Sequence, residues 1–271
     1  MGITNIAFIG CGGMAGAHRE SLKKLWQAGC REFNVVAVCD IVEPKAADMS
    51  KQIEEFTGHA PAVYTDAATM LEKEKEIQSV FVVTPHNNHH VSACMALEAG
   101  KNVLIEKPLG ITVRAAKLIM DCAEKSGKLL HVAENYRMDV HERALHWSVK
   151  RGDIGAPRIL NWLDVGERKW YWDWRDHLDI SGGAWTFDGG VHHSDLFQYN
   201  LGGIKRVTAV MNTYDNLRYA KYESISDYEQ AKLDKRSAHF RKTRSLNPID
   251  PSTLGADRSD RRRHHRGDTR I

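Results

Sequence analysis

The first 135 residues alternate short apolar runs with longer segments whose apolar residues recur at helical spacing. The apolar runs have the length of buried strands and cover residues 6–9, 34–39, 62–64, 79–83, 102–105 and 129–133. The helical segments between and after them cover residues 17–28, 45–56, 67–75, 89–99 and 112–126. Strands that alternate with helices in this way predict an α/β fold with a doubly wound parallel sheet and right-handed crossovers.

After Arg137 the pattern changes. We expect a helix at Asp139–Arg151, a strand at Arg158–Val165, a helix from Trp185 to Leu201 and another strand at Lys205–Tyr214. A second domain is therefore expected to begin near residue 136.

Two glycines, Gly189 and Gly190, lie inside the predicted helix over Trp185–Leu201. Each glycine in a helix interior costs about 1 kcal/mol relative to alanine. We therefore expect another group to approach the backbone closely at this point.

A glycine-rich turn follows the first apolar run, in the pattern Gly10-x-Gly12-x-x-Ala15. In a dinucleotide-binding turn the first glycine permits the bend, the second lets the backbone approach the pyrophosphate, and the small third residue lets helix pack on strand. The second apolar run ends in Asp40, where an acid can bind the ribose hydroxyls of the adenosine. The alternative is a glycine-rich loop of an unrelated α/β domain, and the order of strand, glycines, helix, strand and acid favours the nucleotide site. We expect the cofactor to bind this turn and this acid, through Gly10, Gly12, Gly13, Met14, Ala15 and Asp40.

Other polar residues follow the later strands of the predicted sheet. Ligands of doubly wound sheets bind outside the carboxyl ends of the strands. Those ends carry Thr84-Pro85, Glu106-Lys107-Pro108 and Glu134-Asn135-Tyr136-Arg137. The further cofactor contacts that we predict are Thr84, Pro85, His89, Glu106 and Lys107.

Three elements carry a family resemblance: Thr84-Pro85-His86-Asn87-Asn88-His89, Glu106-Lys107-Pro108 and Asp188-x-Gly190-x-His192-x-x-Asp195. With the glycine turn, this set resembles the Gfo/Idh/MocA family of NAD(P)-dependent sugar and polyol oxidoreductases, from about Ile3 to about Tyr214. The resemblance implies a Rossmann domain, then an α/β domain with an open, mainly antiparallel sheet, and a substrate site between them. It also implies that Lys107, Asp188 and His192 are the catalytic residues.

With the resemblance, we expect an NAD-binding Rossmann domain over residues 1–135 and a substrate and catalytic domain over residues 136–235. From its composition, we expect residues 236–271 to be a disordered basic tail. Second domains of this family normally continue well past the equivalent of Tyr214. Beyond Arg241 the chain has no aromatic residue and few aliphatic ones, too few to offset an ordering cost of about 1–2 kcal/mol per residue. We therefore expect a shortened or altered C-terminal end and an incomplete second sheet, by truncation, by frame shift or as a natural short variant.

The chemistry of alcohol oxidation fits the three catalytic candidates. A secondary alcohol loses a hydride to the nicotinamide while its hydroxyl proton leaves to a base, and His192 is the natural general base. Asp188, one helical turn earlier, is expected to hold the tautomer of His192, and Lys107 to stabilise the developing alkoxide. The predicted function is hydride transfer between NAD and a secondary alcohol of a sugar or polyol.

Substrate contacts are expected from the catalytic residues Lys107, Asp188 and His192 and from Asn135, Arg137 and Asp195. Plainer explanations exist: Lys107 as a solvated lysine after a strand, Asp188 and His192 as an ordinary i,i+4 helix pair, and Asp195 as a helix-surface or capping residue. The glycines beside Asp188 favour the catalytic interpretation.

The predicted cofactor is NAD, with no metal. Asp40 is followed by Ile41 and not by an arginine, and a carboxylate accepts from ribose hydroxyls but repels the 2′-phosphate of NADP. The histidines near His86 and His192 invite a metal site, but neither cysteines nor an H-E-x-x-H pattern support one.

Two other function classes stay open. One is a relative that retains NAD while it cleaves glycosides or epimerises sugars, which would release no NADH during turnover. The other is a non-catalytic, truncated sugar-binding homologue, which would need neither Lys107 nor the Asp188/His192 pair.

The positive charge of the chain is concentrated at its C-terminal end. Residues 236–271 carry ten Lys and Arg against four Asp, which leaves residues 1–235 with a formal net charge of −3. The mildly acidic body argues against a nucleic-acid partner, and so does the tail, because Arg258–Arg270 contains no aromatic residue for base stacking.

No apolar run approaches membrane-spanning length, no leader precedes the first strand, and the five cysteines form no C-x-x-C pair. We expect a cytoplasmic protein with reduced thiols and no membrane partner; homo-oligomer formation stays open.

Overall fold

A computed structural model describes residues 2–166 and 173–210 of the chain. These residues fall into two compact units, the first comprising Met1–Leu160 and His177–Ile204 and the second Asn161–Asp176 with the residues from Lys205 onward. The second unit is described only at residues 161–166, 173–176 and 205–210, where it contains the short 3-10 helix η3 (Asp173–Asp176). The first unit contains the sheet and the candidate site.

The first unit is built on a six-stranded sheet in the order β3-β2-β1-β4-β5-β6, with every neighbouring pair parallel. The strands are β1 (Thr4–Ile9), β2 (Phe33–Cys39), β3 (Ala62–Tyr64), β4 (Ser79–Val82), β5 (Asn102–Ile105) and β6 (Leu130–Val132). The chain moves outward from β1 to β3 and then returns to the other side of β1, which creates the crevice where doubly wound sheets bind nucleotides. The prediction of a doubly wound parallel sheet is confirmed.

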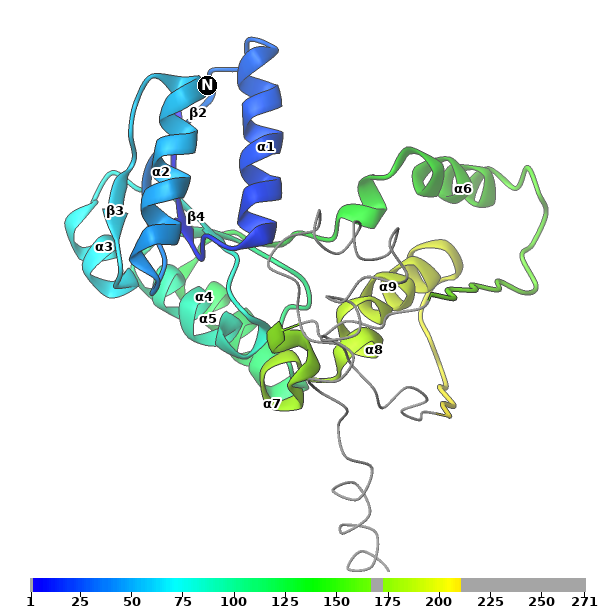
Figure 1. Ribbon diagram of the computed structural model, residues 1–271. Coiled ribbons are helices and arrows are strands. Elements are labelled where there is room, and N and C mark those ends of the chain that lie inside the picture. The colour runs from blue at the N-terminus through cyan, green and yellow to red at the C-terminus, as the bar shows by residue number, and fades with distance from the viewer. Residues whose placement is uncertain (1, 167–172, 211–271) are drawn as a thin grey trace, which may run out of the picture. The chain divides into compact units, whose positions relative to one another are not determined.

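Five helices of the first unit connect these strands. They are α1 (Gly13–Gln27), α2 (Glu43–Thr57), α3 (Ala67–Lys73), α4 (His89–Glu98), preceded by the 3-10 turn η1 (His86–Asn88), and α5 (Val113–Ser126). Helices α1 and α2 lie beside each other, and so do α4 and α5 (Figure 1). The helix ends follow the expected signals: Asp66 and Thr112 accept hydrogen bonds from Thr69 N and Ala115 N, and Gly58 closes α2 in the left-handed conformation.

Alternate residues of β1 go to opposite faces of the sheet, and each face has its own apolar core. Ile6 and Phe8 pack with residues of α1 and α2, such as Leu22 and Ile53. Ala7 and Ile9 pack in the other core with residues of α3, α4 and α5, such as Leu97. Both faces of this strand are therefore buried from Ile6 onward, which explains why residues 6–9 are all apolar and do not alternate with polar ones.

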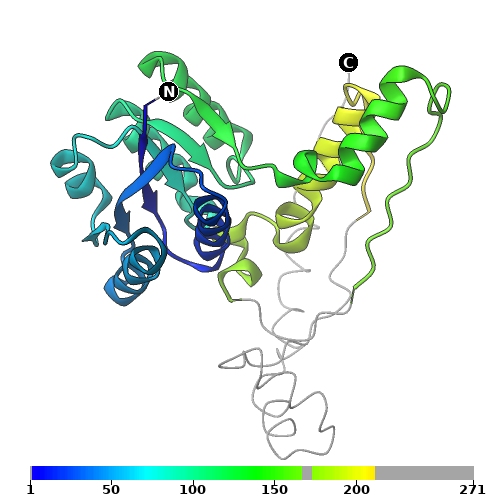
Figure 2. The same cartoon turned by 90° about the horizontal axis from the view of Figure 1, so that it is seen from above.

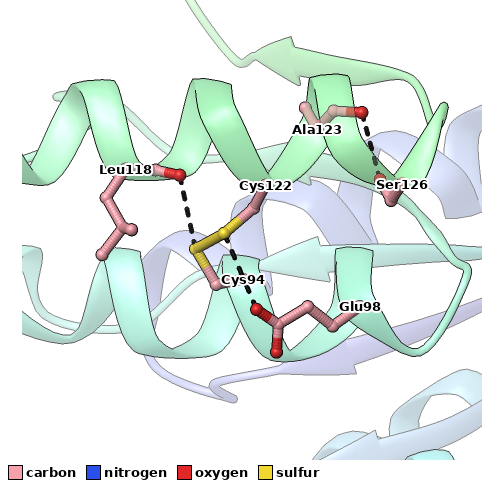
Figure 3. The surroundings of a disulfide bond; sticks show 6 residues. All are labelled: Cys94, Glu98, Leu118, Cys122, Ala123 and Ser126. Atoms are coloured by element: carbon pink, nitrogen blue, oxygen red, sulfur yellow. Dashed lines mark hydrogen bonds between the residues drawn. A yellow bond between two sulfur atoms is a disulfide. The ribbon is translucent and has the colours of Figure 1, made fainter.

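Helices α4 and α5 are also joined covalently, by a disulfide between Cys94 and Cys122 whose Cα atoms are 5.6 Å apart (Figure 3). The expectation that all thiols are reduced is therefore wrong for this pair. The two residues lie 28 positions apart, so only the packing of the two helices brings them together. Cys11, Cys30 and Cys39 are free, and burial raises the pKa of Cys11 to about 12 and that of Cys39 to about 11.

After β6 the first unit continues with helices only. They are η2 (Asn135–Met138), α6 (Val140–Arg151), α7 (Leu178–Ser181), α8 (Ala184–Asp188) and α9 (Gly190–Leu201). Helices α6 and α9 lie side by side (Figure 2). None of the helices in the described ranges is long and apolar enough to cross a membrane.

Two expectations for this region are corrected. Residues 158–165 form no strand, and neither do residues 205–210 of the second predicted strand, because a strand requires backbone pairing with a neighbour and neither segment has such pairing within residues 2–166 and 173–210. The rest of that strand, the completion of the second sheet and the basic tail fall on residues 211–271, outside the described ranges.

The predicted helix over Trp185–Leu201 is in fact two helices separated at Gly189. A Cβ on Gly189 would lie 2.8 Å from the ring of Trp185, so the expected close approach to the backbone is confirmed there. A Cβ on Gly190 would meet nothing within 4 Å. Asp188 and His192 therefore belong to different helices.

The close approach at Gly10 generates a prediction. This residue has φ +97°, and a Cβ on it would lie 2.3 Å from the carbonyl oxygen of Val83. We expect Gly10→Ala to lower the free energy of unfolding by on the order of 3 kcal/mol, from backbone strain and from the collision with the backbone that follows β4. Gly16→Ala is the matched control, because a Cβ there meets nothing within 4 Å in α1 and should stabilise by up to about 1 kcal/mol. Chemical denaturation measures both, and equal stabilities for the two variants would contradict the packing described.

Candidate functional site

The carboxyl ends of the central strands lie at one level. Ile9 pairs with Cys39 and with Val82, and Val82 pairs with Ile105. The residues that follow these strands therefore leave the sheet along a single edge. Gly10, Asp40 and Glu106 were all predicted from the sequence to be part of the site.

The turn after β1 presents the amino end of α1. Gly12 is the N-cap residue, without a side-chain hydrogen bond, and the first turn contains no acidic residue. A Cβ at Gly12 or Gly13 would meet nothing within 4 Å, whereas Ala15 is fully buried against the sheet. Backbone N–H groups at an open helix terminus suit a diphosphate, so this turn fits the cofactor that the pattern predicted.

Asp40 is held against the turn by backbone hydrogen bonds. Its Oδ2 accepts from Cys11 N at 2.8 Å, and its Oδ1 accepts from Val42 N at 2.9 Å. Each carboxylate oxygen has a second lone pair. The side chain is therefore fixed in place and can still accept from ribose hydroxyls.

Glu106 links α1 to the loop after β5. Its Oε1 lies 2.7 Å from His18 Nε2, and its Oε2 accepts from Lys107 N at 3.1 Å. The Glu106 side chain is buried, and the Lys107–Pro108 peptide bond is cis. His18 was not predicted as a site residue, because nothing in its helical position showed that it reaches the end of β5.

Lys107 and Asp188, which are 81 positions apart, meet at this edge. Lys107 Nζ donates to Asp188 Oδ1 and to the Asp188 carbonyl oxygen, at 2.8 Å each. His86 approaches the same carboxylate oxygen, with Nε2 3.4 Å from Asp188 Oδ1, and its Nδ1 lies 2.9 Å from the carbonyl oxygen of Ser181. His86 was expected only as part of the family-resemblance element after the fourth strand and of the rejected metal cluster, and the structure makes it a neighbour of two catalytic candidates.

His192 has a different carboxylate partner from the one expected. Its Nδ1 lies 2.6 Å from Glu134 Oε1, and its ring stacks on Tyr136 with centroids 4.0 Å apart and an angle of 8° between the planes. No hydrogen bond joins His192 to Asp188 among the described residues. The expectation that Asp188 holds the tautomer of His192 is therefore corrected: the break at Gly189 separates the two residues, and Glu134 takes that position.

Two of the predicted substrate residues bind each other. Arg137 donates to both oxygens of Asp195, at 2.5 and 2.7 Å, and this hydrogen bonding raises the pKa of the guanidinium. The pair connects η2 to α9. Asn135, the third predicted substrate residue, opens η2 and is exposed.

His89 is packed behind the site and is fully buried. Its Nδ1 lies 2.8 Å from the carbonyl oxygen of Pro108, and its Nε2 lies 3.0 Å from that of Thr84. The predicted cofactor contact of His89 is therefore corrected, because a side chain with no exposed surface cannot touch a bound dinucleotide. It connects the segments after β4 and β5, while Pro85 and Met14 lie exposed near the same edge.

Within the described residues, no group of three or more His, Cys, Asp or Glu side chains is arranged to hold a metal ion. The polar residues at the edge instead form three separate linkages: His18–Glu106, Lys107–Asp188–His86 and His192–Glu134.

The buried imidazole of His89 gives a prediction of acid sensitivity. Burial, the largest cause, lowers its pKa to about 4, although hydrogen bonds to Pro108 and Thr84 act in the opposite direction. In the unfolded chain the ring titrates near its ordinary value of about 6.5. Between these two values the unfolded state binds a proton that the folded state does not bind. The free energy of unfolding therefore keeps its full value above about pH 6.5 and falls as the pH drops towards 4.

Thermal midpoints between pH 7 and 4.5 measure this effect. We expect His89→Gln to flatten the decline, and we expect the control His131→Gln, at an exposed position, to leave it unchanged. An identical decline in all three proteins would show that His89 is not its source.

The chain is similar to known oxidoreductases. Residues 4–134 match the oxidoreductase family described as having an NAD-binding Rossmann fold. An inositol 2-dehydrogenase/D-chiro-inositol 3-dehydrogenase of Lacticaseibacillus casei is 33% identical over 159 residues, which are 58% of this chain and 43% of that protein. A D-glucoside 3-dehydrogenase of Escherichia coli is 29% identical over 211 residues, 75% of this chain and 56% of that protein. The chain thus spans about half the length of these relatives.

Solved structures agree with this similarity. The structure of an oxidoreductase of Thermotoga maritima matches with a TM-score of 0.64 and 28% identity, over 74% of this chain and 60% of that one. A levoglucosan dehydrogenase solved with NADH has a similar fold, with a TM-score of 0.60 and 24% identity over 73% of this chain and 54% of that one. The sheet order, the glycine turn and these matches lead to one conclusion: residues 4–134 form a Rossmann domain similar to the NAD-binding domain of the Gfo/Idh/MocA oxidoreductases.

Proposed function

We propose that this protein is an NAD-dependent dehydrogenase that acts on a secondary alcohol of a sugar or polyol. The observation that carries the proposal is the hydrogen-bonded ion pair between Lys107 and Asp188. This pair lies at the carboxyl edge of the sheet, and the glycine turn lies at the same edge. The relatives, which include inositol, D-glucoside and levoglucosan dehydrogenases, support the substrate class.

In this proposal residues 1–135 hold the cofactor and residues 136–235 contribute the substrate side of the site. The open amino end of α1 receives the diphosphate, and Asp40 receives the adenosine ribose. Thr84, Pro85, Met14 and Glu106 line the same edge. Bound NAD supplies the hydride acceptor.

Asp40 also favours NAD over NADP. Its carboxylate is fixed beside the turn by Cys11 N and Val42 N, so it cannot swing away from a 2′-phosphate without losing both hydrogen bonds. A phosphate near a fixed carboxylate is repelled.

The chain's own residues provide the acid–base chemistry. Lys107 donates a hydrogen bond to the substrate oxygen and stabilises its negative charge while the hydride leaves. Asp188 holds the ammonium group in place through two contacts at 2.8 Å. His192 accepts the hydroxyl proton as general base. Asn135, Arg137 and Asp195 are proposed to contact the substrate farther from the reacting carbon.

Cofactor preference can be tested by calorimetric titration. We expect wild type to bind NAD more tightly than NADP, and Asp40→Asn to weaken NAD by about 10-fold and to reduce the preference, since about 1.4 kcal/mol of binding energy corresponds to that factor. Asp48→Asn is the matched control, because that acid lies on α2 and hydrogen-bonds Gln52. Tighter binding of NADP to wild type would overturn the ribose assignment.

Turnover tests the catalytic residues, with NADH release followed across a panel of sugars and polyols. Lys107→Ala and His192→Ala should lower the rate by about 10²–10⁴-fold, the usual contribution of general acid–base and electrostatic catalysis, with NAD binding retained. Lys117→Ala changes an exposed residue of α5 and should leave the rate unchanged. Near-wild-type turnover in His192→Ala would require another base. Substrate conversion without NADH release would favour the NAD-retaining alternative.

A further inference from the structure

We propose that Glu134 is the positioning residue of His192: it fixes which ring nitrogen carries the proton and balances the charge that the ring acquires. This inference deepens the proposed function, in which His192 is the general base. It rests on Glu134, a carboxylate to which the family resemblance assigns no role.

The tautomer follows from the contact itself. Glu134 Oε1 lies 2.6 Å from His192 Nδ1, and an ionised carboxylate can only accept hydrogen bonds. The proton of the neutral ring is therefore on Nδ1, and Nε2 carries the lone pair. A general base needs such a lone pair, and the opposite tautomer would place it against Glu134.

Glu134 is itself held in place before any ligand binds. The same oxygen, Oε1, accepts a hydrogen bond from Tyr136 N at 3.1 Å and so caps the 3-10 helix η2. The ring of Tyr136 then lies parallel to that of His192 at 4.0 Å. One short turn of chain thus fixes both the plane of the imidazole, by stacking, and its protonated nitrogen, by the hydrogen bond.

Burial makes the pairing strong. The side chains of His192 and Glu134 are only 9% and 11% exposed, and a charge-assisted hydrogen bond is worth more where water is largely excluded. When His192 takes up a proton, the carboxylate 2.6 Å away stabilises the imidazolium. The pair therefore supports the base both before and after proton transfer.

Neighbouring charged groups have other partners. Asp188 binds Lys107 and lies next to His86. Asp195, on the same helix as His192, binds Arg137, and His146 of α6 stacks on Tyr199 of α9. Each cation of the site thus has its own carboxylate, with Asp188 assigned to Lys107 and Glu134 to His192.

The direct test is the tautomer of His192, read from long-range ¹H–¹⁵N correlation spectra of protein labelled in its histidine rings. The His192 signals are assigned by their loss in His192→Asn. We expect the neutral ring of the wild type to carry its proton on Nδ1. In Glu134→Ala the proton should move mainly to Nε2, as in an unrestrained imidazole, and turnover should fall by at least about 10-fold, up to the full contribution of the base.

Glu134→Gln separates geometry from charge. The amide oxygen can still accept from Nδ1–H, so the tautomer should persist, but the imidazolium loses its counterion. The titration midpoint of the His192 signals, and with it the acidic limb of the kcat/KM profile, should therefore move to lower pH. Glu124→Gln, which removes one charge at an exposed position of α5, is the matched control and should change neither.

The outcomes distinguish this inference from the function on which it rests. A proton on Nε2 in the wild type, or a tautomer unchanged in Glu134→Ala, would show that Glu134 does not position the ring. If Glu134→Ala does not fold, an unchanged His192 midpoint in Glu134→Gln would overturn the inference. Failure to release NADH with every substrate would contradict the proposed dehydrogenase, while the spectra would still decide the role of Glu134.

Discussion

The candidate site depends on the ion pair between Lys107 and Asp188. Lys107 leaves the end of β5, and Asp188 ends α8, 81 residues later. Each side chain is largely buried, at 13% and 7% exposed, so neither charge has full access to water. Removing Asp188 would take this carboxylate away from a largely buried ammonium group, and breaking a buried ion pair typically costs about 3–5 kcal/mol. The pair therefore holds the helical segment after β6 against the edge of the sheet as well as placing the ammonium group.

The sequence predicted the sheet well because its signals there are local. Apolar runs such as Ser79–Val82 end at Thr84-Pro85, and caps such as Asp66 lie beside the helices they begin, so each element could be assigned from about ten residues. The strand order follows from the same alternation, since right-handed crossovers leave few other arrangements. The glycine turn could be predicted because the backbone at Gly10 has a positive φ and lies so close to Val83 that only glycine fits there.

The site was predicted less completely because its contacts join distant parts of the chain. Helical spacing suggested that Asp188 faces His192, but the Trp185 ring against Gly189 divides that helix. The partners His18, His86 and Glu134 have ordinary local contexts, and only the packing of α1, η1 and η2 around the strand ends reveals their roles. The same reason explains the missed disulfide. For the second sheet, the strand expected at Arg158–Val165 has no pairing partner in the described part of the chain.

The disulfide between Cys94 and Cys122 has a topological consequence. It closes a covalent ring that contains the second half of α4, the whole of β5, the Glu106-Lys107-Pro108 segment and most of α5. A single backbone cut inside this ring, for example near Gly110, would leave the two fragments tethered to each other. The two fragments would then separate covalently only if the disulfide were also reduced. The oxidation state of the two cysteines on α4 and α5 therefore determines whether a cut in the loop that contains Lys107 divides the chain.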